Sequence, residues 1–353
     1  MPGIFDMRVL ARLLFLAWLA LLAPSAWAAD GGGGAKEQAQ RQQTQPLNNA
    51  PVWREVRKGE NPYQTTQVRG TESTILVQSE GETWRRLRNG PITIYGGWLI
   101  VLVAVAIGLF YWRKGAIKLH GTPTGRMIER FSDWDRIVHW TTAISFVILA
   151  LSGIVMLFGK YILLPVFGYT LFSWLAILCK NLHNFVGPLF AICTVLMFVT
   201  FVKDNLPKAY DLNWFAKAGG LVSGEHVPSG RFNAGEKSWF WVGVTGFGIV
   251  VSVTGFVLDF PAIVQGARAS MQQANVIHAI AAVLFMTISL GHIYLGTIGM
   301  EGAYESMRNG AVDETWAKEH HEYWYNEVRG QTKTAGGAPS AAHASAMKEG
   351  WKL

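Results

Sequence analysis

The amino-acid sequence predicts an all-α membrane protein, built as a bundle of transmembrane helices. Half of its 353 residues are hydrophobic and only 16% are charged, a balance that is typical of chains in lipid. Five apolar runs follow one another along the chain, each with at least the roughly 20 residues that cross a bilayer core as a helix. The net charge of +7 comes from basic residues spread over the loops between these runs, and this spread excludes nucleic-acid binding.

The first 28 residues have the pattern of a cleavable signal peptide. Arg8 and Arg12 precede a short apolar run, which is followed by the small-x-small tripeptide "AWA" at 26–28. We expect cleavage after Ala28 or the next residue, with an uncleaved anchor as the alternative. Residues 29–90 are polar and rich in Gly and Gln, and they would then form a periplasmic segment whose function the sequence does not indicate.

The charges of the loops set the expected topology of the spans. Loops 113–136 and 203–237 are rich in Lys and Arg, whereas loop 259–270 contains a single Arg. Because basic loops stay in the cytoplasm, the chain should cross inward at the first span, and the tail at 303–353 should be cytoplasmic. The five spans are expected at 91–112, 137–159, 181–202, 238–258 and 271–300.

Residues 161–180 are apolar enough to be taken for a sixth span. Pro165, Gly168 and Lys180 indicate instead a re-entrant or interfacial piece on the outer face. The loop charges agree with this interpretation, because a sixth crossing would invert the topology of everything downstream.

Four of the nine histidines lie in the spans, at two matching depths. His278 and His292 are fourteen residues apart on the last span. On a helix this spacing separates them by about 21 Å and brings them within about 40° of one face. By depth, His183 can meet His278 near the outer surface, and His139 can meet His292 near the inner surface. The remaining five are interpreted as solvated loop or tail side chains: His120, His226, His320, His321 and His343.

Each two-histidine layer suits a six-coordinate haem b, because the iron takes one nitrogen on either side of the porphyrin. One shared metal ion would need all four ligands together, and two zinc sites would lack Cys or carboxylate ligands. With two cysteines and no C-x-x-C-H motif, the chain can neither attach haem covalently nor hold an iron–sulfur cluster alone. Two non-covalent b haems are therefore expected. Arg136 and Lys180 each stand three positions before a proposed ligand and are either partners of haem propionates or ordinary interfacial charges.

Several motifs, in order along the chain, carry a resemblance to a known family: "RFSDWDRIVHW", "NLHNFVGP", "RFNAGEKSWFW", "VIHA…GHIYLG" and the tail "EHHEYWYNEV". Together they resemble the cytochrome b (gamma) subunit of membrane-bound respiratory formate dehydrogenase over about 125–330. The resemblance implies a four-helix transmembrane di-haem cytochrome b bundle at 137–302, here with one extra N-terminal transmembrane helix at 91–112 and a cleavable signal peptide. It also implies a place in the inner membrane of a bacterium.

The same resemblance implies a role in a respiratory complex. Electrons from a periplasmic iron–sulfur (beta) subunit would pass through the two b haems to quinone at the cytoplasmic side. Formate itself would be oxidised in a molybdenum or tungsten catalytic (alpha) subunit. The family assigns the haem ligands as the depths of the histidines do, and it places the quinone at the "NAG" segment, here Asn233 and Gly235. The chain would thus be the quinone-reducing electron-transfer subunit of an enzyme complex.

Two alternatives to this function stay open. The first keeps the haems and changes the electron donor, as in the cytochrome b subunit of a nickel–iron hydrogenase or of another molybdenum oxidoreductase. The second is a haem-free transporter or anchor in which the four histidines relay protons. The absence of Asp and Glu from the spans around these histidines disfavours it, because proton relays usually employ carboxylates.

Overall fold

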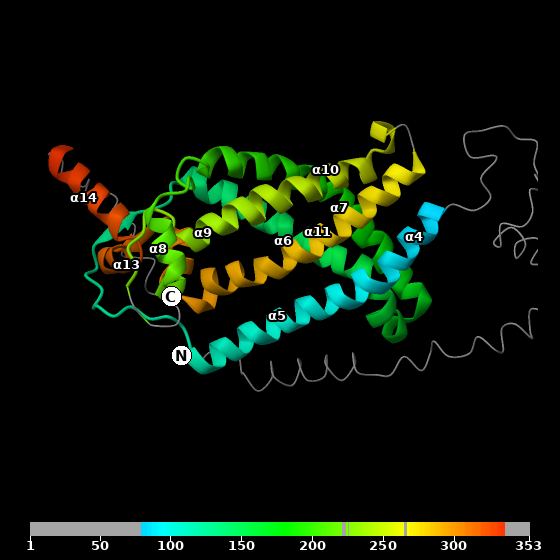
Figure 1. Ribbon diagram of the computed structural model, residues 1–353, viewed down its shortest axis with the longest axis horizontal. Helices are drawn as coiled ribbons and strands as arrows, with labels where there is room; N and C mark the ends of the chain where they lie inside the picture. Colours follow the sequence, from blue (N-terminus) through cyan, green and yellow to red (C-terminus); the bar gives the residue numbers. More distant parts are fainter. Residues whose placement is uncertain (1–78, 221–223, 225, 265–266, 336–353) are drawn as a thin grey trace, which may run out of the picture. The chain divides into compact units, whose positions relative to one another are not determined.

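The computed structural model divides into two compact units, Met1–Thr83 and Trp84–Leu353. The first unit lies almost wholly outside the described residues, and with it the predicted signal peptide at 1–28 and most of the predicted segment at 29–90. The second unit contains the helices discussed below (Figure 1). The structure describes residues 79–220, 224, 226–264 and 267–335.

Five helices in the described part of the chain are long and apolar enough to cross a membrane, which confirms the predicted transmembrane bundle. Helices α10 and α11 pack along each other, α6 packs along α7, and α5 lies against α11 (Figure 1). Large apolar side chains such as Leu102, Ile144 and Val199 are exposed, as expected for surfaces that contact lipid. The spans consist of α4 (Ser79–Leu87), η1 (Arg88–Ile92) and α5 (Thr93–Lys114); α6 (Asp133–Ile162); α7 (Leu164–Phe201); α9 (Ala234–Ser238), η3 (Trp239–Phe247) and α10 (Gly248–Asp259); and α11 (Arg268–Tyr294) with η5 (Leu295–Gly299).

Helix α7 begins well before the predicted start of the third span at residue 181. Its only non-helical backbone lies at Gly168, with φ of 70°, just after Pro165 in the first turn. Beyond Gly168 the helix continues through Lys180, which is exposed and does not interrupt it. Residues 161–180 therefore add no sixth span, as predicted, but most of them extend α7 instead of forming a separate re-entrant piece. From 169 to 201 a helix runs for about 50 Å, which exceeds the roughly 30 Å hydrocarbon core.

The loops and the tail fold together into a small unit at one end of the bundle, which we call the cap (Figure 1). Its strands pair antiparallel, with Ile128 opposite Val312. Gly310, with φ of +83°, sits where a Cβ would lie 2.5 Å from the Phe131 carbonyl oxygen, so only glycine fits. The cap consists of β1 (Met127–Glu129), α8 (Tyr210–Ala216), η2 (Ala218–Gly220), α12 (Ala303–Asn309), β2 (Ala311–Asp313), α13 (Glu314–His320) and α14 (Glu322–Ala335).

The cap has its own apolar core, although the sequence predicted only a loop and a tail for these residues. Trp316 of α13 and Trp324 of α14 are buried in it together with Val312 of β2. The Trp316 indole donates to the Glu301 carbonyl oxygen at 2.8 Å, so its polar atom is satisfied inside this core. The predicted loop at 113–136 and residues 303–335 of the predicted tail are thus joined into one folded body, and the rest of the tail lies outside the described residues.

Candidate functional site

The structure places the four span histidines in two pairs, each made by different helices. His183 of α7 and His278 of α11 have ring centroids 6.1 Å apart. His139 of α6 and His292 of α11 have centroids 6.3 Å apart. A metal ion bonded to two imidazole nitrogens at about 2 Å each separates the ring centroids by about 6 Å. Both pairs therefore have the spacing of axial ligands to one iron.

In the His183–His278 pair, one hydroxyl group on a neighbouring helix fixes the tautomer of each ring. The Ser152 hydroxyl donates to the Ile148 carbonyl oxygen at 2.8 Å, so it accepts from His183 Nδ1, also 2.8 Å away. The Thr254 hydroxyl donates to the Val250 carbonyl oxygen at 2.6 Å. It accepts from His278 Nδ1 at 3.0 Å. With the proton on Nδ1, both Nε2 atoms are left with a free lone pair for a metal.

The His139–His292 pair has a different environment. His292 stacks on Trp239, with ring centroids 4.7 Å apart and an angle of 11° between the planes. His139 Nδ1 is buried, and no hydrogen-bond partner for it exists in the described part of the chain. A buried ring nitrogen without a partner is costly, and a group bound in the site would supply the missing partner. This pair therefore also fits a bound metal centre.

Two glycines leave room for a flat macrocycle beside the histidines. Gly187 follows His183 by four residues on α7, and a Cβ built on it would meet no atom within 4 Å. The same is true of Gly291, which precedes His292 and lines a cavity. Both pairs thus combine facing imidazoles with open space at a neighbouring small residue, as a porphyrin requires.

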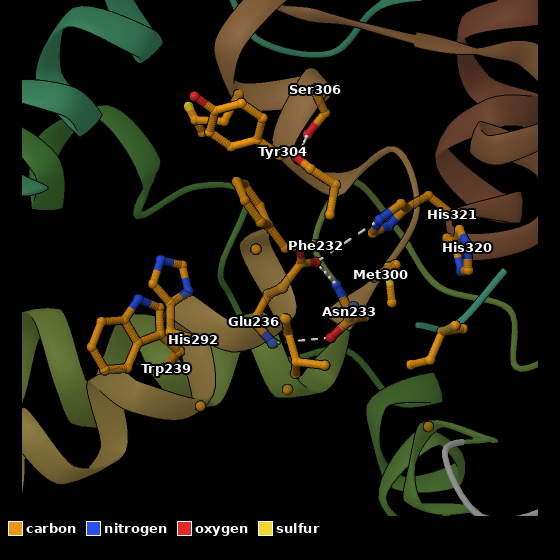
Figure 2. A pocket seen from close by; sticks show the side chains of 18 of the residues that line it. Phe232, Asn233, Glu236, Trp239, His292, Met300, Tyr304, Ser306, His320 and His321 are labelled. Carbon is orange, nitrogen blue, oxygen red and sulfur yellow. Dashed lines mark hydrogen bonds and ion pairs between the residues drawn. The ribbon is translucent and has the colours of Figure 1, made fainter. Parts of the chain in front are cut away.

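A cavity of about 1070 Å³ lies at the His139–His292 pair, and both histidines line it. Asn233 and Gly235, the predicted quinone residues, line the same cavity. The Asn233 side-chain oxygen caps α9 by accepting from the Glu236 backbone N–H at 2.9 Å, so its NH₂ group is the part that can donate to a ligand. Figure 2 shows Asn233 and Glu236 hydrogen-bonded to each other, with His292 and Trp239 in the same pocket.

The two predicted propionate partners differ in their surroundings. Arg136 donates to the Arg308 carbonyl oxygen at 2.7 Å and pairs with Asp133, and these contacts tie it to the cap and to its own helix. Lys180 is exposed on α7. A role for either residue beside a propionate stays a prediction.

His320 and His321 were predicted to be solvated tail residues, and this prediction is wrong. The side chain of His321 is 2% exposed, and its Nδ1 donates to the Gly230 carbonyl oxygen at 2.7 Å. His320 lines the cavity, and its buried Nε2 has no hydrogen-bond partner among the residues described. Burial lowers the pKa of His320 to about 4 and that of His321 well below its ordinary value. The aromatic-rich motif "EHHEYWYNEV" was the available signal that this tail packs into a core.

Comparison with known proteins agrees with the paired histidines. A family model described as prokaryotic cytochrome b561 matches residues 130–310. The chain belongs to the prokaryotic cytochrome b561 family. As a member of this cytochrome b family, it is a multi-pass membrane protein that binds haem b and transfers electrons. The matched residues include all four paired histidines and both predicted quinone residues, whereas α5 precedes them.

Relatives of this chain include cytochrome b556 subunits of formate dehydrogenases. The formate dehydrogenase cytochrome b556(fdo) subunit of Escherichia coli K12 is 31% identical over 214 residues, which make up 58% of this chain and 95% of that subunit. The nitrate-inducible cytochrome b556(Fdn) subunit of the same strain is 32% identical over 208 residues, 58% of this chain and 92% of that subunit. The cytochrome b556 subunit of Haemophilus influenzae formate dehydrogenase is 25% identical, over 54% of this chain and 79% of that subunit.

Proposed function

We propose that this chain is the cytochrome b subunit of a formate dehydrogenase in a bacterial inner membrane. It would take electrons from a periplasmic iron–sulfur subunit and deliver them to quinone at the cytoplasmic side. A molybdenum or tungsten catalytic subunit would oxidise formate. The observation that carries the proposal is the pair of histidine layers, with centroid separations of 6.1 and 6.3 Å, on a chain similar to formate dehydrogenase subunits over nearly their whole length.

Two bis-histidine b haems would supply one-electron iron centres, one at each layer. The outer ligands would be His183 and His278, and the inner ligands His139 and His292. Phe285 of α11 is buried halfway between His278 and His292, and its ring contacts that of Phe146 with centroids 4.8 Å apart. Aromatic packing of this kind fixes the spacing of the layers and excludes water from the space between them.

The cavity at the inner layer would hold the quinone head group. Its walls are mainly apolar, as expected for a site that receives its ligand from lipid, with a few polar groups that can orient a carbonyl. The NH₂ group of Asn233 is suited to donate to a quinone carbonyl oxygen. At Gly235 a Cβ would lie 2.7 Å from the Trp214 ring, so a side chain there would displace the indole that also lines this cavity.

The proposed direction of electron flow depends on the topology expected from the loop charges. It requires a signal peptide at 1–28, the segment 29–90 in the periplasm, and the loop 113–136 and the tail 303–353 in the cytoplasm. Single cysteines introduced near His183 and in the cap should then react with membrane-impermeant thiol reagents from opposite sides of the membrane. Labelling of both from the same side would contradict the proposed path.

Single alanine substitutions of the four histidines test the haem assignment. We expect His183→Ala and His278→Ala to abolish the same component of the reduced-haem spectrum in membranes. His139→Ala and His292→Ala should abolish the other component. The pairing is wrong if His139→Ala and His278→Ala remove the same component, and the proposed function fails if the wild-type chain carries no b-type haem.

The electron donor is tested with membranes that contain the chain and its native partners. Formate should reduce both haem components, and extraction of the peripheral subunits should abolish this reduction while dithionite still reduces them. Reduction by hydrogen gas and not by formate would identify the alternative, a hydrogenase cytochrome b.

A further inference from the structure

The cavity wall formed by α9 and the cap contains titratable side chains that the proposed electron path does not use. They include Glu236 of α9, Glu319 and His320 of α13, and His321, which follows α13. Reduction of one quinone to quinol consumes two electrons and two protons. The proposed function supplies the electrons, and the protons must reach a site enclosed by the bundle and the cap.

Glu236 occupies the centre of this group. Its Oε1 accepts from Arg130 Nη2 at 3.0 Å and its Oε2 accepts from the Asn233 backbone N–H at 2.8 Å. The Glu236 side chain is 35% exposed although its partner Arg130 is only 4% exposed. Because Glu236 lines the cavity, that exposed surface faces the space in which a ligand would sit.

His321 faces the same carboxylate with its unprotonated nitrogen. Since Nδ1 donates to the Gly230 carbonyl oxygen, Nε2 carries the lone pair, and it lies 4.0 Å from Glu236 Oε2 (Figure 2). One water bridging these two atoms would let a proton pass between them. His320, which is partly buried and whose Nε2 has no hydrogen-bond partner among the described residues, lines the same cavity.

A partly exposed pair of titratable side chains includes one further residue of the cavity lining. His226 Nε2 lies 2.9 Å from Glu322 Oε2, and the two side chains are 37% and 35% exposed. His226 also lines the cavity. Titratable groups therefore line this cavity from a partly exposed residue, His226, to the space beside Asn233.

We propose that Glu236, His320 and His321 carry protons from the cytoplasmic side to the quinone, with Glu236 as the last donor. The inference rests on the proposed function. In each turnover the two C=O groups of the quinone become two C–OH groups. The two electrons arrive one at a time along the proposed path, and each of the two protons leaves the Glu236 carboxyl group. The carboxylate is reprotonated each time from solvent through the histidines, so charge and atoms balance.

A purely structural role for Glu236, as partner of Arg130 and as part of the α9 cap, makes a different prediction. Glu236→Gln keeps one oxygen that can accept from the Asn233 backbone N–H, but its NH₂ group cannot accept from Arg130. The variant therefore removes the transferable proton, the charge and the hydrogen bond from Arg130. If the Glu236 carboxylate is only structural, its replacement should lower the haem content or the affinity for the ligand. If the carboxylate donates protons, its replacement should lower the maximal rate of quinol formation.

The test uses membranes with the full-length chain, whose haems are reduced with limiting dithionite and then mixed with a water-soluble short-chain quinone. Two reduced haems supply the two electrons. For Glu236→Gln we expect quinol formation to slow by about 100-fold, with haem content and the half-saturating quinone concentration unchanged, and with a larger solvent isotope effect. Glu236→Asp should restore part of the rate. The matched control is Glu314→Gln, which removes a carboxylate paired with Arg126 in the cap, away from the cavity lining, and should behave as wild type.

The outcomes separate this inference from the proposed function. Wild-type haems that quinone does not reoxidise would overturn the proposed function, and the inference with it. A wild-type rate in Glu236→Gln, or a raised half-saturating concentration with an unchanged maximal rate, would overturn the proton path alone. If Glu236→Gln loses haem, His320→Gln decides, because His320 Nε2 has no hydrogen bond to lose. A rate slowed at least tenfold in that variant supports the path, and a wild-type rate overturns it.

Discussion

Single hydroxyl groups distinguish the two histidine layers at the residue scale. Ser152 and Thr254 hold the Nδ1 protons of His183 and His278, whereas His139 Nδ1 has no partner among the described side chains. An imidazole that donates a hydrogen bond through Nδ1 is a more basic ligand through Nε2 and is fixed in orientation. The His183–His278 pair, proposed as the outer layer, is therefore expected to bind its metal in a more rigid geometry than the His139–His292 pair, proposed as the inner layer.

Substitution of Ser152 by alanine tests this difference. Loss of the acceptor for His183 Nδ1–H should weaken haem binding at the outer layer by about tenfold or more and raise its reduction potential. Haem titration and a spectroelectrochemical redox titration measure both effects. Ser145→Ala is the control, since the buried Ser145 hydroxyl on the same helix bonds only to the Thr141 and Thr142 carbonyl oxygens. Equal haem affinity and potential in the two variants would show that the Ser152 contact does not tune the ligand.

At the scale of the elements, the π-helix η3 determines how the inner layer is packed. π-helices occur mostly as single turns near functional sites, and this one extends from Trp239 to Phe247. The wider turn leaves room for the Trp239 ring over Gly243, where a Cβ would lie 2.5 Å from Trp239 Cε3. Trp239 is thereby positioned for its stack on His292.

Gly243→Ala is expected to push Trp239 away from His292. The absorption and potential of the inner haem component should change, whereas the outer component should stay as in wild type. Optical redox titration resolves the two components. Gly108→Ala serves as the control, because a Cβ at Gly108 in α5 meets no atom within 4 Å. A change of equal size in both components would contradict a local effect of Trp239.

The elements also show what could be predicted from the sequence. Apolar runs predict all five spans because lipid imposes length and hydrophobicity on each of them. The same signal misplaces the start of α7, since hydropathy detects the part of a helix that suits lipid and not the full hydrogen-bonded helix. Lys180 suggested a boundary, but a charged side chain on a helix surface does not end the helix. The backbone break lies at Gly168.

At the scale of the whole molecule, the sequence predicts the part of the site that follows from helical periodicity, which is the two histidine layers. It does not predict the part that is formed by the folding of the cap. The fourteen-residue spacing of His278 and His292 places two layers on one helix without further information. Glu236 and His321 meet only because a loop and the tail fold together. Strands of three residues carry little pattern, and contacts between distant segments leave no periodic signal in the sequence. The approach of Glu236 and His321 could therefore not be predicted from the sequence.

The cap should loosen when the pH falls below neutrality. Burial lowers the pKa of His320 from 6.5 to about 4. The positive charge of Arg130 and the nearby His226 lower this pKa further, whereas the carboxylates of Glu319 and Glu236 raise it. Between these two values the folded side chain is neutral while the unfolded one is protonated, so the unfolded state binds more protons. The free energy of unfolding of the cap therefore falls as the pH is lowered from 6.5 to 4, by about 3 kcal/mol at most from this residue.

Hydrogen exchange of the α13 amides, corrected for its intrinsic pH dependence, measures this loss of stability. Protection of Glu314–His320 should decline through the window in the wild-type chain and decline less in His320→Gln, which has no imidazole to protonate. Amides of α6 within the bundle provide the internal reference, since they do not depend on the docking of the cap. Parallel decline in the wild-type chain and the variant would assign the pH sensitivity to another group. Protection that stays constant down to pH 4 would mean that His320 accepts its proton without leaving its buried position.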